Sequence, residues 1–137
     1  MLYRFLIYGL LGWNIEIMFT GLDSLLRGDL RLGSFTSLWM FFIYGLAVFL
    51  EPIHDRIIRW PWPARGLFWL FLIWGIEYVC GLILVNLLEV YPWHYTDVYA
   101  IHGLITLRFA PFWFAGGLLF EKIHHFLDSL QIVRSKK

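Results

Sequence analysis

The sequence is poor in charge and in cysteine. Only 15% of its 137 residues are Asp, Glu, Lys or Arg, whereas 60% are apolar and 20% are aromatic. Soluble domains carry about 25% charged residues, so this composition excludes an ordinary soluble domain and predicts a small integral membrane protein. The net charge of +1 is too small to indicate nucleic acid binding. The single cysteine, Cys80, can form no intrachain disulfide and does not identify a redox compartment.

Several catalytic motifs are also missing. The chain has no Gly-rich phosphate loop, no Gly-x-Ser-x-Gly and no His-Glu-x-x-His. Nothing therefore supports nucleotide hydrolysis by this chain alone. We assign no catalytic residue, metal or cofactor, and we favour a protein that is not an enzyme.

Four stretches of about 20 residues are apolar enough to cross a bilayer. They run roughly over residues 2–22, 35–53, 66–88 and 102–126. Four spans leave no room for a second domain in 137 residues. The sequence predicts a single all-α transmembrane domain of four helices over residues 1–137, ending in a short basic tail.

The distribution of Lys and Arg predicts the orientation, because positive charge is retained on the cytoplasmic side. One side holds eight basic residues: Arg4, Arg56, Arg59, Arg65, Lys122, Arg134, Lys136 and Lys137. The other side holds only Arg27, Arg31 and Arg108. Both termini are therefore predicted to be cytoplasmic, and the tail is predicted to contact anionic lipid.

The four spans also predict two tandem repeats of two helices. A shift of 61 residues lays Glu16 onto Glu77, with Trp13 on Trp74 and Ile15 on Ile76. A shift of 70 aligns the second and fourth spans at six positions: Gly33, Thr36, Phe42, Glu51, Ile53 and His54 fall on Gly103, Thr106, Phe112, Glu121, Ile123 and His124. The halves would share one orientation around an axis along the membrane normal. Chance similarity between apolar helices is the alternative.

Glu16 and Glu77 lie in the middle of apolar segments, where a carboxylate costs about 2.5 to 3.5 kcal/mol or more. Such residues face a bundle interior, a partner or a substrate path, so we predict an intramembrane polar site that contains both. The carboxylates would be protonated or paired with a cation, and Arg108 is the basic residue best placed to pair; the alternative is that it reaches the outer headgroups. We assign further polar-site positions to Trp13, Asn14, Thr20 and Trp74.

The connection over residues 91–102 has the densest set of functional side chains, and we predict that it forms an outer lid over the site. Its lid residues are Trp93, His94, Tyr95, Asp97 and His102. The spacing of His94, Asp97 and His102 matches no specific metal signature. An aromatic belt at the membrane interface is the alternative interpretation.

Three further histidines fall near the cytoplasmic ends of the second and fourth spans. They are His54, His124 and His125. Haem ligation by two histidines on different helices is conceivable there. The helix dipole alone also favours histidine at a helix C-terminus.

These motifs together resemble a known family, the CmpB-like type-IV ABC-transporter permeases, together with the animal transmembrane protein 229 group. The likeness covers nearly the whole chain and is strongest in residues 12–20, 36–45, 74–81, 92–95 and 103–121. Its loop motif usually has Asp where this chain has His94. The resemblance implies a multi-span membrane protein.

The sequence therefore favours transport or binding of a small solute, ion or lipid at the glutamate site. Four spans are few for a transporter, so a homodimer or a partner membrane subunit is expected beside membrane lipid. One alternative is an intramembrane enzyme on a lipid-type substrate, with Glu16 or Glu77 as general acid or base and His94 or His102 as proton partner. The other is a structural or assembly subunit of a membrane complex.

Overall fold

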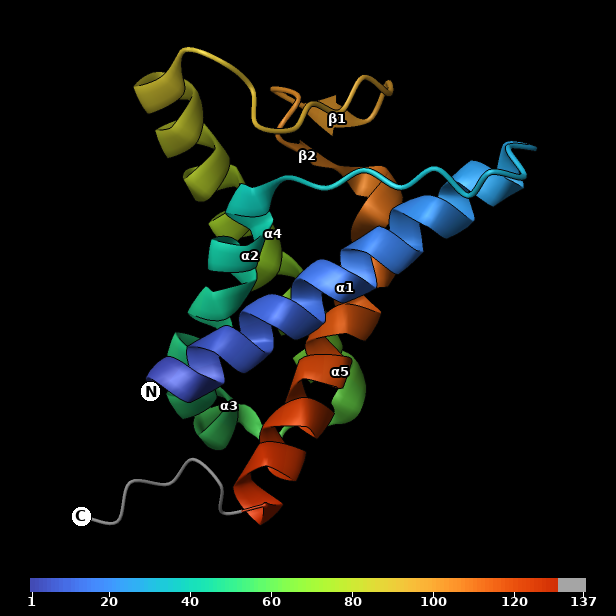
Figure 1. Cartoon of the computed structure of the whole chain (residues 1–137). Coiled ribbons are helices and arrows are strands. Elements are labelled where there is room, and N and C mark those ends of the chain that lie inside the picture. The colour runs from blue at the N-terminus through green and yellow to red at the C-terminus, as the bar shows by residue number, and fades with distance from the viewer. Residues whose placement is uncertain (131–137) are drawn as a thin grey trace. The chain divides into compact units, whose positions relative to one another are not determined.

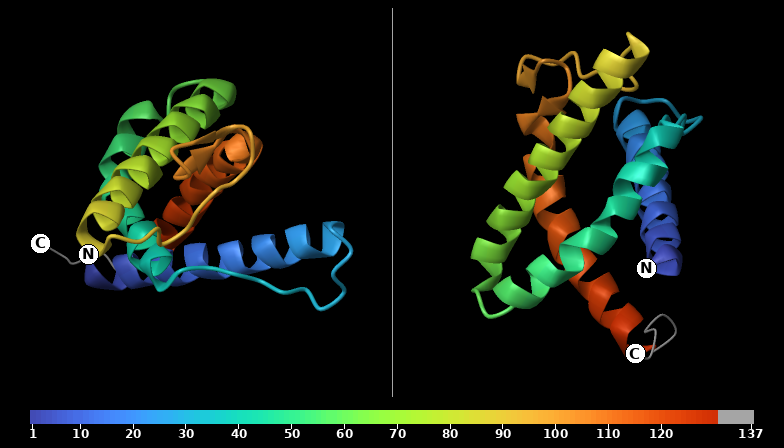
Figure 2. Two further views of the ribbon diagram at one scale, coloured as in Figure 1. Left: turned by 90° about the horizontal axis from the view of Figure 1, so that it is seen from above. Right: turned by 90° about the vertical axis from the view of Figure 1, so that its left-hand side faces the viewer.

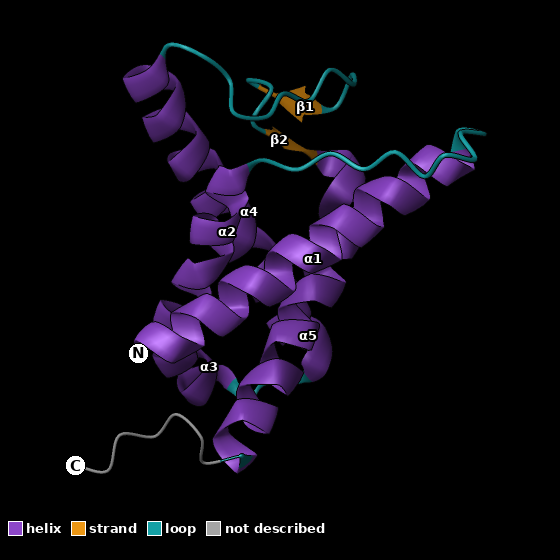
Figure 3. Cartoon of the chain, in the orientation of Figure 1, coloured by secondary structure: helices purple, strands orange, loops and turns teal. Residues whose placement is uncertain are grey.

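The computed structural model describes residues 1–130, and their fold is helical, as predicted (Figures 1 and 3). Its elements in chain order are α1 (Leu2–Leu26), α2 (Leu38–Gly45), the 3-10 helix η1 (Leu46–Leu50), α3 (Glu51–Ile57), α4 (Trp62–Leu88), β1 (Ala100–Ile101), β2 (Ile105–Thr106), the 3-10 helix η2 (Leu107–Phe109) and α5 (Ala110–Ser129). Residues 134–137 of the predicted basic tail lie outside the described part.

Within residues 1–130, three helical stretches are long and apolar enough to cross a membrane. They are Leu2–Leu26, Leu38–Ile57 and Trp62–Leu88, with mean hydropathies of 1.4, 1.2 and 2.1. The second stretch joins α2, η1 and α3. Large apolar side chains project outward from these helices, including Met18, Phe71 and Ile83, as lipid contact requires. An integral membrane protein is the class that these helices support.

The fourth apolar segment differs from the prediction, because its helix begins at Ala110 and not at residue 102. Residues 102–109 form a turn, strand β2 and the 3-10 helix η2 instead. His102 and Gly103 have φ values of 50° and 70°, which a helix cannot contain, and Pro111 stands in the first turn of α5, where proline is favoured. The second half of α5 carries Glu121, Lys122 and Asp128, so α5 is not among the three candidate spans.

The chain divides into two compact units, and the division falls inside η1. Unit 1 is Met1–Val48, and unit 2 begins at Phe49. A short 3-10 stretch within a longer helical run often marks a change in local structure. The first unit contains α1 and α2, whereas the second contains α3, α4 and α5.

In unit 1, α1 packs closely on α2 through glycines. A side chain added at Gly9 would come within 2.7 Å of the Phe41 carbonyl oxygen, and one at Gly45 within 2.6 Å of the Phe5 ring. Gly12 faces the ring of Tyr44 in the same way. Small residues allow helices to approach in lipid, where dispersion contacts drive association.

In unit 2, α4 and α5 cross each other, and the segment between them folds at the end of α4 (Figure 2, right). Gly66 of α4 faces the ring of Phe114, and Gly117 of α5 faces Trp69, so each helix offers a glycine to an aromatic ring of the other. Trp69 is fully buried in this contact. This packing places Arg65 and Trp69, early in α4, near Glu121, late in α5.

Candidate functional site

Glu77 is the most deeply buried of the predicted site residues. It lies in the middle of α4 with only 3% of its surface exposed. The phenol of Tyr95 donates a hydrogen bond of 2.8 Å to Glu77 Oε1. Tyr95 belongs to the connection that follows α4, so a predicted lid residue contacts a predicted core glutamate.

The segment that carries Tyr95, which we call the cap, covers residues 91–106. Its two short strands pair antiparallel, with Ala100 opposite Thr106 and Ile101 opposite Ile105. His102 and Gly103 turn the chain with positive φ, as a three-residue hairpin loop requires. The cap is therefore a folded element.

Three contacts hold the cap together and against α4. Trp93 Nε1 donates to the Leu104 carbonyl at 3.1 Å, and Leu104 is buried against Gly81 of α4. The backbone N–H of Tyr95 donates to Gly103 O at 2.9 Å. These bonds fix the backbone of Tyr95 beside the C-terminal turns of α4.

The other predicted lid residues also lie in the cap. Asp97 Oδ1 accepts from Thr106 Oγ1 at 2.8 Å and from the Tyr99 N–H at 3.0 Å, closing the hairpin. His102 Nδ1 lies 2.6 Å from the hydroxyl of Tyr78, the neighbour of Glu77 on α4. The His94 ring packs over Gly103. The five residues thus gather at one end of unit 2, although their action as a lid stays a prediction.

Glu16 has a comparable setting in unit 1. Its carboxylate lies close to the side chains of Tyr44 and Thr36. Both glutamates therefore lie about half-way along a long helix, with a tyrosine close to the carboxylate. Trp13 and Trp74 each precede their glutamate by three residues, and within residues 1–130 neither indole N–H has a hydrogen-bond partner.

Three predicted polar-site residues have other roles. The Asn14 side-chain amide donates to Leu10 O at 2.7 Å, and Thr20 Oγ1 donates to the Glu16 backbone carbonyl at 2.9 Å. Both bonds return to the preceding turn of their own helix, as polar side chains in helices often do. Arg108 is exposed on η2, where it lines an open depression of about 590 Å³ with Asp97, Val98, Tyr99 and Leu107. Its pairing with a glutamate stays a prediction.

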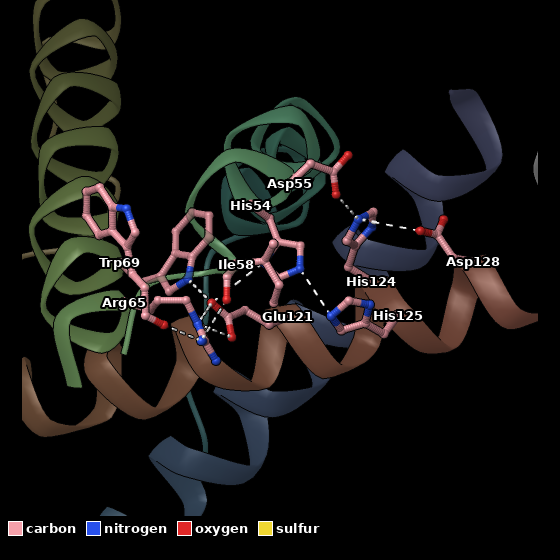
Figure 4. Close-up of polar contacts among 10 residues, drawn as sticks. His54, Asp55, Ile58, Arg65, Trp69, Glu121, His124, His125 and Asp128 are labelled. Carbon is pink, nitrogen blue, oxygen red and sulfur yellow. Dashed lines mark hydrogen bonds and ion pairs between the residues drawn. The ribbon is translucent and has the colours of Figure 1, made fainter. Parts of the chain in front are cut away.

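A second polar cluster, which the sequence analysis did not assign, lies at the opposite end of unit 2 (Figure 4). Its anchor is Glu121 on α5, which is 5% exposed. Arg65 Nε donates to both carboxylate oxygens of Glu121, at 2.9 and 3.1 Å, and Trp69 Nε1 donates to Oε1 at 2.7 Å. Arg65 also donates to the Ile58 and Trp60 carbonyls, which ties the turn between α3 and α4 to this pair.

Histidines of α3 and α5 complete this cluster. His54 Nδ1 lies 3.6 Å from Glu121 Oε1, and His124 Nδ1 lies 3.4 Å from Glu51 Oε1. Each Glu-x-x-His motif thus places its histidine against the glutamate of the other motif. The signal was visible in the sequence as matching motifs, but the motifs do not reveal that α3 and α5 face each other.

Comparison with known protein families places the chain in a membrane-transporter-related family. The family model described as "Putative ABC-transporter type IV" matches residues 3–136, almost the entire chain. No solved structure matches the chain.

Proposed function

The chain belongs to this ABC-transporter-related membrane family, and from that premise we propose that it binds a small solute or ion at Glu77, beneath the cap, for transport across the membrane. The observation that carries the proposal is the 2.8 Å hydrogen bond between Tyr95 of the cap and the buried carboxylate of Glu77. It joins the middle of an apolar helix to a segment outside the helices.

The energetic argument begins with the cost of Glu77. A carboxylate at membrane depth costs at least about 2.5 kcal/mol, so its presence indicates a role in a binding site or pathway. Movement of the cap would admit a ligand, and its return would place the Tyr95 phenol and the Glu77 carboxylate together on that ligand. Closure of a loop or domain around a ligand is a known gating motion of enzymes and binding proteins.

The chemistry of the site favours a cationic ligand. A carboxylate and a phenol oxygen attract a proton, a metal cation or an amine, and they disfavour an anion. The Tyr78 and His102 pair beside Glu77 adds a hydroxyl and an imidazole that can exchange protons. A cation or a proton-coupled solute is therefore the proposed ligand class.

Glu16 completes the proposal as a second intramembrane carboxylate with its own tyrosine partner. The two-repeat architecture makes Glu16 the counterpart of Glu77, whereas Tyr44 and Tyr95 are not equivalent positions of the repeat. The reciprocal pairs of Glu51 with His124 and of His54 with Glu121 support the same repeat, because exchange of partners is what a pseudo-twofold axis produces. We propose α5 as the fourth membrane helix of this arrangement.

The proposed molecule has both termini in the cytoplasm and acts as a homodimer or with a partner membrane subunit. Orientation follows from the excess of Lys and Arg on one side. Few spans per chain make a second subunit necessary to enclose a path. Membrane lipid surrounds the assembly.

Native mass spectrometry of protein released from lipid particles tests the ligand site. The wild-type chain is expected to carry a retained small molecule that Glu77→Gln loses while the protein remains folded. Tyr99→Phe is the matched control, because Tyr99 is an exposed tyrosine of the same cap whose hydrogen bonds to Asp97 and Leu107 are made by its backbone.

Two outcomes would contradict the proposal. Equal retention of the molecule by the wild type and by Glu77→Gln would remove Glu77 from the site. A wild-type chain that carries no small molecule but a stoichiometric second polypeptide would favour the assembly-subunit alternative.

A further inference from the structure

We propose that the cluster of His54, His124 and His125 with Asp55 binds one divalent transition-metal ion of the Zn²⁺ class between α3 and α5. The cluster lies at the opposite end of unit 2 from Glu77 and is independent of the solute site. Ligand atoms of His54, Asp55 and His124 lie within 4.8 Å of one another. Imidazole and carboxylate are the donors that such ions accept.

The spacing of the imidazole nitrogens supports a shared ion. Nε2 of His54 lies 3.2 Å from Nε2 of His125 (Figure 4). Two nitrogens bound to one tetrahedral Zn²⁺, each about 2.0 to 2.1 Å from the ion, stand about 3.3 to 3.4 Å apart. Only a small movement separates the observed pair from that geometry.

His124 contributes from the same face of α5. Its Nε2 atom lies 3.5 Å from Asp55 Oδ1 and 3.6 Å from Asp128 Oδ2. These distances exceed a good hydrogen bond but suit two ligands that share one ion. The site therefore draws ligands from α3 and α5, and an ion there would join the two helices.

The remaining nitrogens of His54 and His124 face carboxylates. His54 Nδ1 faces Glu121, and His124 Nδ1 faces Glu51. Metal-binding histidines commonly present one nitrogen to the ion and direct the other toward a carboxylate, which fixes the tautomer and raises ligand basicity. Arg65 and Trp69 occupy Glu121, so this residue supports a ligand and does not bind the ion itself.

Two of the proposed ligands are buried, and the other two are exposed to solvent. His54 is fully buried and His124 is 3% exposed, so their rings are held in place. The Asp55 side chain is 71% exposed, and His125 is also exposed. An ion can therefore reach the site from solvent without unfolding of unit 2.

The donor set also selects the ion. Mg²⁺ and Ca²⁺ prefer oxygen ligands, so a set rich in imidazole disfavours them. Haem between His54 and His125 is disfavoured as well, because Nε2 atoms 3.2 Å apart leave no space for a porphyrin. A borderline ion such as Zn²⁺ fits three imidazoles and one carboxylate.

Metal titration of the full chain, purified in detergent without a polyhistidine tag, tests the site. Co²⁺ serves as the spectroscopic probe and Zn²⁺ as its competitor. We expect one tightly bound Co²⁺ per chain with an intense visible spectrum of low coordination number, complete displacement by Zn²⁺, and no displacement by Mg²⁺.

Variants then locate the ion. Asp55→Asn and His125→Asn alter exposed residues, so they should fold normally and weaken binding by more than about tenfold each. The double variant His54→Asn, His124→Asn should lose the spectrum. His94→Asn is the matched control, because it removes a histidine of the cap, and it should bind Co²⁺ as the wild type does.

The proposal is overturned if Co²⁺ binds no more tightly to the wild type than to the Asp55→Asn and His125→Asn variants. It is also overturned if only His94→Asn loses the ion. Neither result bears on solute retention at Glu77, so the two proposals can fail separately.

Discussion

The two buried carboxylates of unit 2, Glu77 and Glu121, have different kinds of hydrogen-bond donor. Glu77 and Glu121 have nearly equal exposure, 3% and 5%. Glu121 is held by a guanidinium and an indole on the adjacent helix, whereas the hydrogen bond from Tyr95 to Glu77 comes from a connecting segment. The difference indicates that Glu121 secures the packing of α4 on α5, while Glu77 is tied to the cap.

The largest expected loss of stability comes from replacing Arg65, the cationic partner of Glu121. Arg65→Gln leaves the Glu121 carboxylate buried without its cationic partner, and loss of one partner of a buried pair costs about 3 to 5 kcal/mol. We expect a large drop in the thermal or denaturant midpoint of the detergent-solubilised protein. The control is Arg27→Gln, which removes an exposed pair with Asp23 and should cost less than about 1 kcal/mol. Equal effects of the two variants would show that Glu121 is not an anchor.

An intermediate loss of stability is expected from a substitution where α4 and α5 cross. Gly117→Ala places a methyl group against the Trp69 side chain, and such overpacking costs about 1 to 3 kcal/mol. Gly116→Ala is a matched control one residue away, because its nearest neighbour is a Trp113 ring atom at 3.9 Å. Gly116→Ala should be neutral or stabilising by up to about 1 kcal/mol. Equal unfolding midpoints for the two variants would contradict the close contact of α4 and α5.

Sequence reasoning identified the membrane class because long apolar segments leave few alternatives in 137 residues. It placed the start of the last helix wrongly, since Leu104, Ile105, Leu107 and Phe109 are as apolar in a hairpin as in a helix. The turn at His102 and Gly103 and the proline at position 111 were the local signals for the later start.

The candidate sites, like the last helix, could be predicted from the sequence only in part. That the 91–102 connection acts as a lid stays a prediction, although its Tyr95 donates a hydrogen bond to Glu77. Thr20 was assigned to the polar site by helical spacing and Asn14 by its place beside Glu16, and each donates its side-chain hydrogen bond to the backbone of its own helix. The Glu121 cluster was missed because helix pairing brings Arg65, Trp69 and His54 together from distant positions, and residue spacing does not encode that pairing.

The most direct test of the account is a double-mutant cycle on Glu77 and Tyr95, with the occupancy of the retained small molecule in native mass spectra as the readout. If the cap and the carboxylate form one site, Tyr95→Phe alone lowers occupancy, and the double variant is as empty as Glu77→Gln alone. A Tyr95→Phe variant that keeps full occupancy, or a Glu77→Gln variant that keeps the molecule until Tyr95 is also changed, would contradict the coupling between cap and carboxylate.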